Sequence, residues 1–159
     1  MKSFLYLLLT LNMVSISAFA AERKCMSMSE RTTSSPAESN NVKVAGVSPP
    51  AGTTVHKWNT LTVDLDYDVK DFDSASYILV AEFDTTKEGR STDGSFTFSK
   101  YPHLIYARGS FRLCFPLKDV WTDPNVKRPF SVRFFLSQMD NPHHFHPVAK
   151  TEPLIFPAG

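Results

Sequence analysis

Three of the five histidines of this 159-residue chain lie within four residues of one another, near the C-terminal end. They belong to the segment Asp140-Asn-Pro-His-His-Phe-His-Pro147. Imidazole is the commonest protein ligand of zinc and copper, and a nearby carboxylate can assist it. The segment is therefore a candidate copper or zinc site, with His143, His144, His146 and Asp140 as ligands. The alternative is a polar loop whose histidines bind no ion.

A second group of possible ligands is the acidic run Asp64-Leu-Asp-Tyr-Asp68, which begins like a calcium-binding loop. The pattern then fails, because Val69 stands where such a loop requires glycine and Ala75 where it requires a bidentate glutamate. Alternate residues of a strand lie about 6.6 Å apart, which is too wide for one ion. We interpret these aspartates as the solvated face of a strand, with a looser calcium site at the following turn as the alternative.

Four aromatic residues could form a flat contact surface for a protein or a sugar: Trp58, Trp121, Tyr101 and Phe145. We select Trp121 and Phe145 as candidate partner-binding residues, and Trp121 lies in a turn-rich connection. The alternative is that these rings pack against the core.

Catalysis requires a nucleophile with a base, or a paired acid and base in a pocket. The sequence contains no G-x-S-x-G, no H-E-x-x-H and no glycine-rich phosphate loop. We therefore expect a protein that is not an enzyme and has no cofactor other than the possible copper or zinc.

The compartment is indicated by residues 1–20, which have the pattern of a secretory signal peptide. Lys2 precedes the apolar run Phe4–Leu11, and Ala18 and Ala20 supply the small residues that a signal peptidase reads. We place cleavage after Ala20. Polar residues interrupt the apolar run, so a membrane anchor is not expected. The sequence thus predicts a soluble mature protein that is periplasmic or secreted.

Charge and cysteine content add to this interpretation. The formal charge is +1, and it falls to zero once Lys2 leaves with the signal peptide, which gives no attraction to nucleic acid. In an oxidising compartment an even number of cysteines suggests a disulfide, here Cys25–Cys114. Closing so long a loop is worth about 4–5 kcal/mol. The alternatives are two free thiols or a disulfide between chains. If Cys25 is in a disulfide, the tail motif Cys25-Met-Ser-Met28 is removed as a copper site.

The elements that must position these residues are strands. Thr60–Val69 alternates strictly between apolar and polar residues, as a strand with one buried face does. In Ser110–Phe115 the same alternation turns Cys114 outward. Strand patterns cover seven segments in all: Val42–Val47, Thr60–Val69, Tyr77–Phe83, Ser95–Ser99, Ser110–Phe115, Phe130–Met139 and Thr151–Phe156. One helical turn is expected within Lys118–Pro129, and a loop over Asp140–Pro147.

These spacings predict an all-β fold, an antiparallel immunoglobulin-like β-sandwich of about seven strands. The domain organisation follows: a signal peptide over 1–20, a flexible N-terminal segment over 21–41, and the sandwich domain over 42–159. An up-and-down barrel is the alternative, although barrels usually have eight or more strands.

Two stretches carry a resemblance to known families. Val47-Ser-Pro-Pro-Ala-Gly-Thr-Thr-Val55, leading into Leu61-Thr-Val-Asp-Leu65, resembles the opening of bacterial immunoglobulin-like modules. It is also similar to the opening of periplasmic copper-resistance β-sandwiches, which bind copper without catalysis. That second family ends with a strand, an acidic turn and a His-Pro, so the resemblance implies His146 as a copper ligand. Its histidine at the mature N-terminus has no counterpart here, where Val42 stands.

Together these observations favour an exported, non-catalytic module that recognises a macromolecular partner, most simply a protein. The alternative is a periplasmic copper or zinc protein that uses the histidines between His143 and His146. The sequence does not identify the partner or the oligomeric state.

Overall fold

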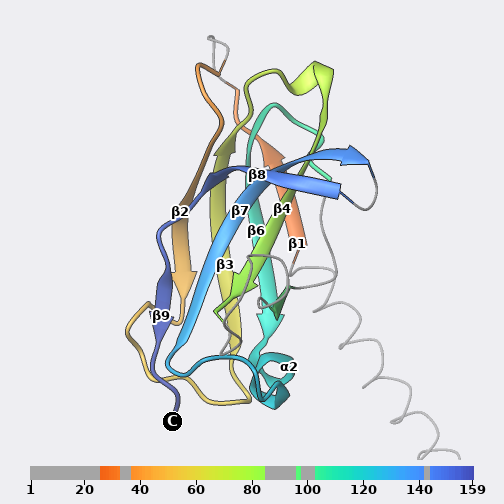
Figure 1. Cartoon of the computed structure of the whole chain (residues 1–159). Coiled ribbons are helices and arrows are strands. Elements are labelled where there is room, and N and C mark those ends of the chain that lie inside the picture. Colours follow the sequence, from red (N-terminus) through yellow and green to blue (C-terminus); the bar gives the residue numbers. More distant parts are fainter. Residues whose placement is uncertain (1–25, 33–36, 85–95, 98–102, 142–143) are drawn as a thin grey trace, which may run out of the picture.

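Two antiparallel β-sheets pack face to face in the computed structural model, which describes residues 26–32, 37–84, 96–97, 103–141 and 144–159 (Figure 1). The first sheet has the strand order β1-β6-β3-β2, and the second has the order β5-β4-β7-β8, with β9 also paired to β7. The predicted all-β sandwich is thereby confirmed, while the immunoglobulin-like assignment stays a prediction. The predicted signal peptide, Cys25, Tyr101 and His143 lie outside the described residues.

The strands of the first sheet are long and regularly paired. They are β1 (Met26–Glu30), β2 (Asn41–Ser48), β3 (Thr60–Asp68) and β6 (Arg108–Pro116). A bulge between Val44 and Gly46 interrupts the pairing of β2 with β3. The second sheet contains β4 (Ser76–Phe83), β5 (Phe96–Thr97), β7 (Phe130–Asn141), β8 (His144–Lys150) and β9 (Leu154–Phe156). Strand β7 is the centre of this sheet, since β4 pairs on one side and β8 and β9 on the other.

The core lies between the sheets and is built by alternation along the strands. On β3, Leu61, Val63, Leu65 and Tyr67 are fully buried, while the residues between them are not. The facing sheet contributes Phe83 from β4 and Phe130, Val132, Phe134 and Leu136 from β7. Because side chains of a strand alternate between faces, this burial fixes the register of each strand.

Two segments correct the expectations drawn from the sequence. Residues 21–41 were expected to be flexible, yet residues 26–30 form β1, which pairs with the edge of β6. Residues 140–147 were expected to form a loop, yet β7 continues to Asn141 and β8 begins at His144. Both segments are largely polar. Each forms a strand because its backbone pairs with another strand: β1 with β6, which is distant in sequence, and β8 with β7, which precedes it.

Short elements close the two ends of the sandwich. The expected helical turn is α2 (Leu117–Thr122), which follows β6 directly, and a 3₁₀ turn, η1 (Phe72–Ser74), precedes β4. Figure 1 shows α2 and the C-terminus at one end of the sandwich and η1 at the other. No helix in the described ranges has the length and apolar character needed to cross a membrane.

Candidate functional site

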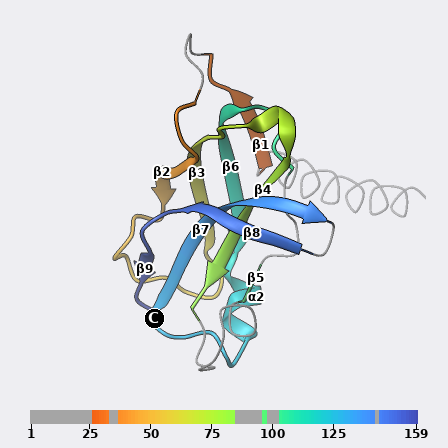
Figure 2. The ribbon, with the colours of Figure 1, turned by 45° about the horizontal axis from the view of Figure 1, so that its top comes forward.

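The histidines of the candidate metal site lie where β7 and β8 meet. In this hairpin Gln138 pairs with His146 and Asn141 with His144, and the register shifts between Met139 and Asn141. The shift leaves Asp140 without a paired residue, as in a β-bulge, which re-aims a side chain. Figure 2 shows these paired ends extending to one side of the sandwich. We call Asp140, His144 and His146 the histidine tip.

One carboxylate oxygen joins the members of the histidine tip. Oδ2 of Asp140 lies 2.8 Å from Nδ1 of His144 and 3.2 Å from Nδ1 of His146. The hydrogen bond from His144, supported by the bond from His146, keeps the pKa of Asp140 below its usual value although slight desolvation opposes this. With Nδ1 donating to the carboxylate, the Nε2 atom of each ring is left to accept a proton or a ligand.

The histidine tip thus brings together three of the four residues predicted as ligands. Its side chains are largely exposed, and both rings present the same nitrogen to the carboxylate. Within the described parts of the chain, no group of three or more His, Cys, Asp or Glu side chains is arranged to hold a metal ion. What the tip offers chemically is two oriented imidazoles beside one carboxylate.

The aspartates of the calcium-like run are occupied by cations on the outer face of the first sheet. Asp64 accepts hydrogen bonds from Nε and Nη2 of Arg112 at 2.7 and 2.9 Å. Asp66 accepts from Ser110 Oγ and from Arg31, and Asp68 from Arg31 and Arg108. This agrees with the interpretation of the run as the polar face of a strand, since the carboxylates neutralise arginines on neighbouring strands.

Cys114 lies on that same outer face. It is opposite Thr62 on β3, and its sulfur is 3.5 Å from the Thr62 hydroxyl. Its neighbours on the inner face, Phe111 and Phe115, are buried, so the predicted outward direction of Cys114 is confirmed. Among the described residues Cys114 is a free, half-buried thiol.

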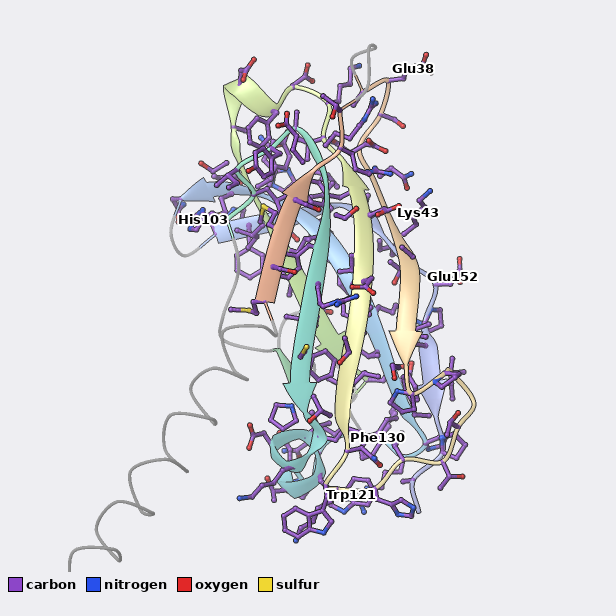
Figure 3. The ribbon with its side chains drawn as sticks, turned by 180° about the vertical axis from the view of Figure 1, so that it is seen from behind. Glu38, Lys43, His103, Trp121, Phe130 and Glu152 are labelled. Atoms are coloured by element: carbon purple, nitrogen blue, oxygen red, sulfur yellow. The ribbon has the colours of Figure 1, made fainter. Side chains whose placement is uncertain are left out.

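Trp121 is held against the core at the α2 end of the sandwich. Its ring lies 5.1 Å from the ring of Phe130, and the guanidinium of Arg128 lies 5.0 Å above it. Arg128 also donates a hydrogen bond to the Trp121 carbonyl at 2.9 Å. Figure 3 shows Trp121 and Phe130 together at this end. Trp121 is therefore half-buried, with one face covered by a cation.

Trp58 is the most exposed large apolar side chain of the described structure, at 76 %. It occupies a tight turn in which the Asn59 N–H donates to the His56 carbonyl at 2.9 Å and the Asn59 side chain accepts from the His56 N–H. The Asn59 carbonyl in turn accepts from Leu117, the first residue of α2. The ammonium of Lys57 lies 4.5 Å from the centre of the Trp58 ring.

Trp58 and Trp121 therefore stand on elements that touch one another at one end of the sandwich. We call this surface the tryptophan end, formed by Lys57, Trp58, Trp121 and Arg128. In the sequence, both tryptophans were among the possible contact aromatics, and Trp121 was placed in a turn-rich connection. The two cations were not singled out in the sequence, because nothing local predicts that they lie over the rings.

Phe145 belongs to a different region. It is half-buried on β8 opposite Met139, near the far end of β7. Trp121 packs on Phe130 at the start of β7, and a strand rises about 3.3 Å per residue, so the two aromatic residues are separated by about 30 Å. The structure does not bring the predicted pair into one contact surface.

Comparison of this chain with models of protein families, with curated proteins and with solved structures finds no match. The resemblance to bacterial immunoglobulin-like modules and to copper-resistance β-sandwiches stays a prediction. The function is therefore argued from the two candidate surfaces, the tryptophan end and the histidine tip.

Proposed function

We propose that this protein is an exported, non-catalytic module that binds a protein partner through the tryptophan end. The observation that carries the proposal is Trp58, a large aromatic side chain that is 76 % exposed on a turn braced by hydrogen bonds. Tryptophan is enriched among the residues that dominate binding energy at protein interfaces. A turn that is already ordered loses little conformational freedom when it binds. Export is supported by the signal-peptide pattern of residues 1–20.

The charge around the tryptophan end favours a partner that presents carboxylates. Lys57 and Arg128 lie over the tryptophan rings, and Lys118 and Lys127 are exposed on α2 and in the segment that follows it. Asp119 and Asp123 offset only part of this charge. An acidic side chain of the partner can pair with a stacked cation while an apolar neighbour covers the ring.

The test is capture of a partner followed by a measured affinity. Immobilised wild-type protein and the Trp58→Ala variant are exposed to the envelope fraction of the source cells, and a retained protein is purified and titrated by calorimetry. We expect Trp58→Ala to weaken its binding at least about tenfold, as removal of a hot-spot residue does.

The matched control is Ile105→Ala, which removes an apolar side chain that is 64 % exposed outside the tryptophan end. It should leave the affinity unchanged. Equal affinities for wild type and Trp58→Ala, or an equal loss in Ile105→Ala, would reject this surface as the binding site.

A second candidate function is copper or zinc binding at the histidine tip. It is favoured by the contacts of Asp140 with both imidazoles, since a carboxylate that holds Nδ1 is a common support for a metal-binding Nε2. Calorimetric titration with Cu(II) and Zn(II) compares the wild type with a triple variant in which His143, His144 and His146 are alanine. Binding tighter than about 100 μM that disappears in the variant supports this function; weaker binding, or equal binding by the variant, removes it.

A further inference from the structure

The outer edge of β1 carries backbone groups that bond to no strand among the described residues (Figure 3). The Arg31 N–H donates to the Arg108 carbonyl at 3.2 Å, which marks one hydrogen-bonded pair of the β1–β6 ladder. Such pairs recur at every second residue of an antiparallel ladder, and the β1–β6 register has no break. The odd-numbered residues of β1 therefore bond to β6. The even-numbered residues, Met26, Met28 and Glu30, direct their N–H and C=O groups away from β6.

The other sheet edges of the described structure are interrupted or very short. A bulge between Val44 and Gly46 interrupts the pairing of β2. Strand β8 contains Pro147 and has two register shifts against β7, while β5 has two residues and β9 three. Bulges, prolines and short strands are means by which proteins prevent pairing between sheet edges. Residues 26–30 contain no proline, lysine or register shift, so this edge is open to a further strand.

We propose that β1 pairs with β1 of a second copy of this chain, antiparallel and related by a two-fold axis at Met28. The pairing joins two four-stranded sheets into one continuous sheet. Such an interface is isologous, because the same surface serves both copies. It uses the edge of β1, goes beyond the function proposed for the tryptophan end, and does not rest on that function.

The backbone groups of two β1 strands match in this register. Met28 lies opposite the partner's Met28, and on either side of the axis Met26 lies opposite the partner's Glu30. All three outward-facing residues then form hydrogen-bonded pairs, with about six hydrogen bonds in total because each such pair exchanges two. An axis at any other residue of β1 leaves at least one of the three without a partner in the strand, and an axis at Glu30 opposes two like charges.

The side chains also match across this pairing. Met28 packs against the core, so Met26, two residues away, shares the inner face of the sheet. Met26 is nevertheless 42 % exposed, which leaves apolar surface for the partner to cover. Because directly opposite side chains lie on the same face, the small side chains of Ser27 and Ser29 oppose one another on the outer face. Like charges are not opposed within this strand pair, since Glu30 lies opposite a methionine.

The size of this interface sets how tightly the two copies bind. A pair of five-residue strands buries less surface than the roughly 1,200–2,000 Å² of a stable specific complex. The dimer should therefore form and dissociate as the protein concentration changes. Association is still favoured, because the backbone of β1 is already ordered along β6 and loses little conformational freedom when it pairs again.

The first test applies sedimentation and amide hydrogen exchange to protein purified from cells that express the full chain, at concentrations up to about 1 mM. Sedimentation should show a monomer–dimer equilibrium. As the dimer forms, the amides of Met28 and Glu30 should become protected, while those of Ser27 and Ser29, which already bond to β6, should change less. A monomer at every concentration would overturn the proposal. So would a dimer without protection at Met28 and Glu30, the result that exchange of β1 strands between copies gives.

The second test changes the charges that face one another across the two-fold axis. In Met26→Glu the new carboxylate lies opposite the partner's Glu30, so the dissociation constant of the dimer should rise about tenfold. Adding Glu30→Lys to this variant places opposite charges there and should restore most of the affinity. Within one chain the two positions lie about 13 Å apart, beyond the Debye length of about 8 Å at physiological salt. Rescue by the double variant therefore reports contact between copies.

The matched control is Ile155→Glu, which adds the same charge at an apolar side chain that is 50 % exposed on β9. It should leave the dissociation constant of the dimer unchanged. Protection of the Ser27 and Ser29 amides at low concentration verifies that β1 stays paired with β6 in each variant. An equal loss of affinity in Ile155→Glu, or no rescue by the double variant, would reject the proposed pairing.

Discussion

The inner and outer faces of the first sheet are built from the same strands by different means, and β3 shows both. On the inner face Leu61, Val63, Leu65 and Tyr67 have no exposed surface. On the outer face the three aspartates of the same strand pair with arginines on β6 and beside β1. The inner face needs only apolar residues at alternate positions, whereas the outer face needs particular partners on other strands.

The two faces also differ in how strongly they should hold the fold. Burying a leucine or valine side chain contributes about 1.5–3 kcal/mol. An exposed ion pair contributes about 0–1 kcal/mol, because water solvates the separated charges almost as well. Burial also raises the pKa of Tyr67 to about 12, so its hydroxyl stays neutral inside. Substitutions on the two faces should therefore fall into two classes of effect.

The largest loss is expected for Leu65→Ala on the inner face. Leu65 is fully buried between Val44 and Phe111, its neighbours on β2 and β6. Removing its branched end leaves a cavity and should lower the free energy of unfolding by about 2–5 kcal/mol. Urea denaturation of wild type and variant measures this. The exposed residue Ile105 is the control, and Ile105→Ala should change stability by less than about 0.5 kcal/mol.

The next largest loss is expected for Gly109→Ala on β6, where the glycine lies between Glu30 of β1 and Tyr67 of β3. A Cβ at this position would lie 2.6 Å from the Ser29 carbonyl oxygen and 2.7 Å from the Tyr67 hydroxyl. Strand β1 must shift to make room, at a cost of about 1–3 kcal/mol. Hydrogen exchange should show faster exchange of the β1 amides, as well as the loss of stability.

Gly46→Ala is the matched control for this effect. Its Cβ would come within 3.3 Å of Asp64 Oδ2, the end of a flexible side chain that can move away. If Gly46→Ala destabilises the protein as much as Gly109→Ala, close packing of β1 on β6 is not the cause.

On the outer face, Asp68→Asn should cost about 1–2 kcal/mol, since Asp68 accepts charged hydrogen bonds from both Arg31 and Arg108. These side chains are partly buried, which strengthens the bonds relative to fully exposed pairs. Thermal unfolding measures the change. In contrast, Lys43→Met removes an exposed partner 3.9 Å from Asp66 and should have an effect below about 0.5 kcal/mol.

The smallest effect is expected for Asp64→Asn, and it should depend on pH. The hydrogen bond from Arg112 lowers the pKa of Asp64 below 3.8 in the folded protein. The Asp64–Arg112 pair therefore stabilises the fold fully at pH values above the pKa that Asp64 has in the unfolded chain. This stabilisation is lost as the pH falls through the lower pKa that Asp64 has in the folded protein. Because the pair is exposed, it is worth less than about 1 kcal/mol at neutral pH.

Urea denaturation of wild type and Asp64→Asn across the acid range measures this dependence. The difference in stability between the two proteins should shrink below the unfolded pKa. A difference that stays constant down to the most acidic condition would mean that ionised Asp64 contributes nothing to the fold.

Sequence patterns located the strands whose inner faces are apolar. The alternation from Thr60 to Val69 predicted β3 almost to its ends, and the same parity predicted that Cys114 points outward. Strands β1 and β8 were not predicted. Met-Ser-Met-Ser-Glu and His-Phe-His-Pro alternate over only a few positions, and most side chains of the two strands stay exposed. Such strands form when a neighbouring strand offers unpaired backbone groups, and a local pattern contains no record of that neighbour.

The candidate site divides in the same way. Asp140, His144 and His146 are close in sequence, so their grouping was predictable; the convergence of both Nδ1 atoms on one carboxylate oxygen required the β7–β8 bulge. Trp58 and Trp121 are distant in sequence, and they share one end because Asn59 is hydrogen-bonded to the start of α2. Phe145 was grouped with Trp121 only because both are aromatic.

By itself the sequence determined the class of fold and the face on which most residues lie, because alternation along a strand depends only on local spacing and on the exclusion of apolar groups from water. The tertiary structure alone decided which strands are neighbours. It thereby set the register of β1 against β6, the arginine partners of each aspartate and the placement of the two tryptophans at one end of the sandwich. These depend on hydrogen bonds and contacts between residues far apart in the chain, whose energies no local pattern records.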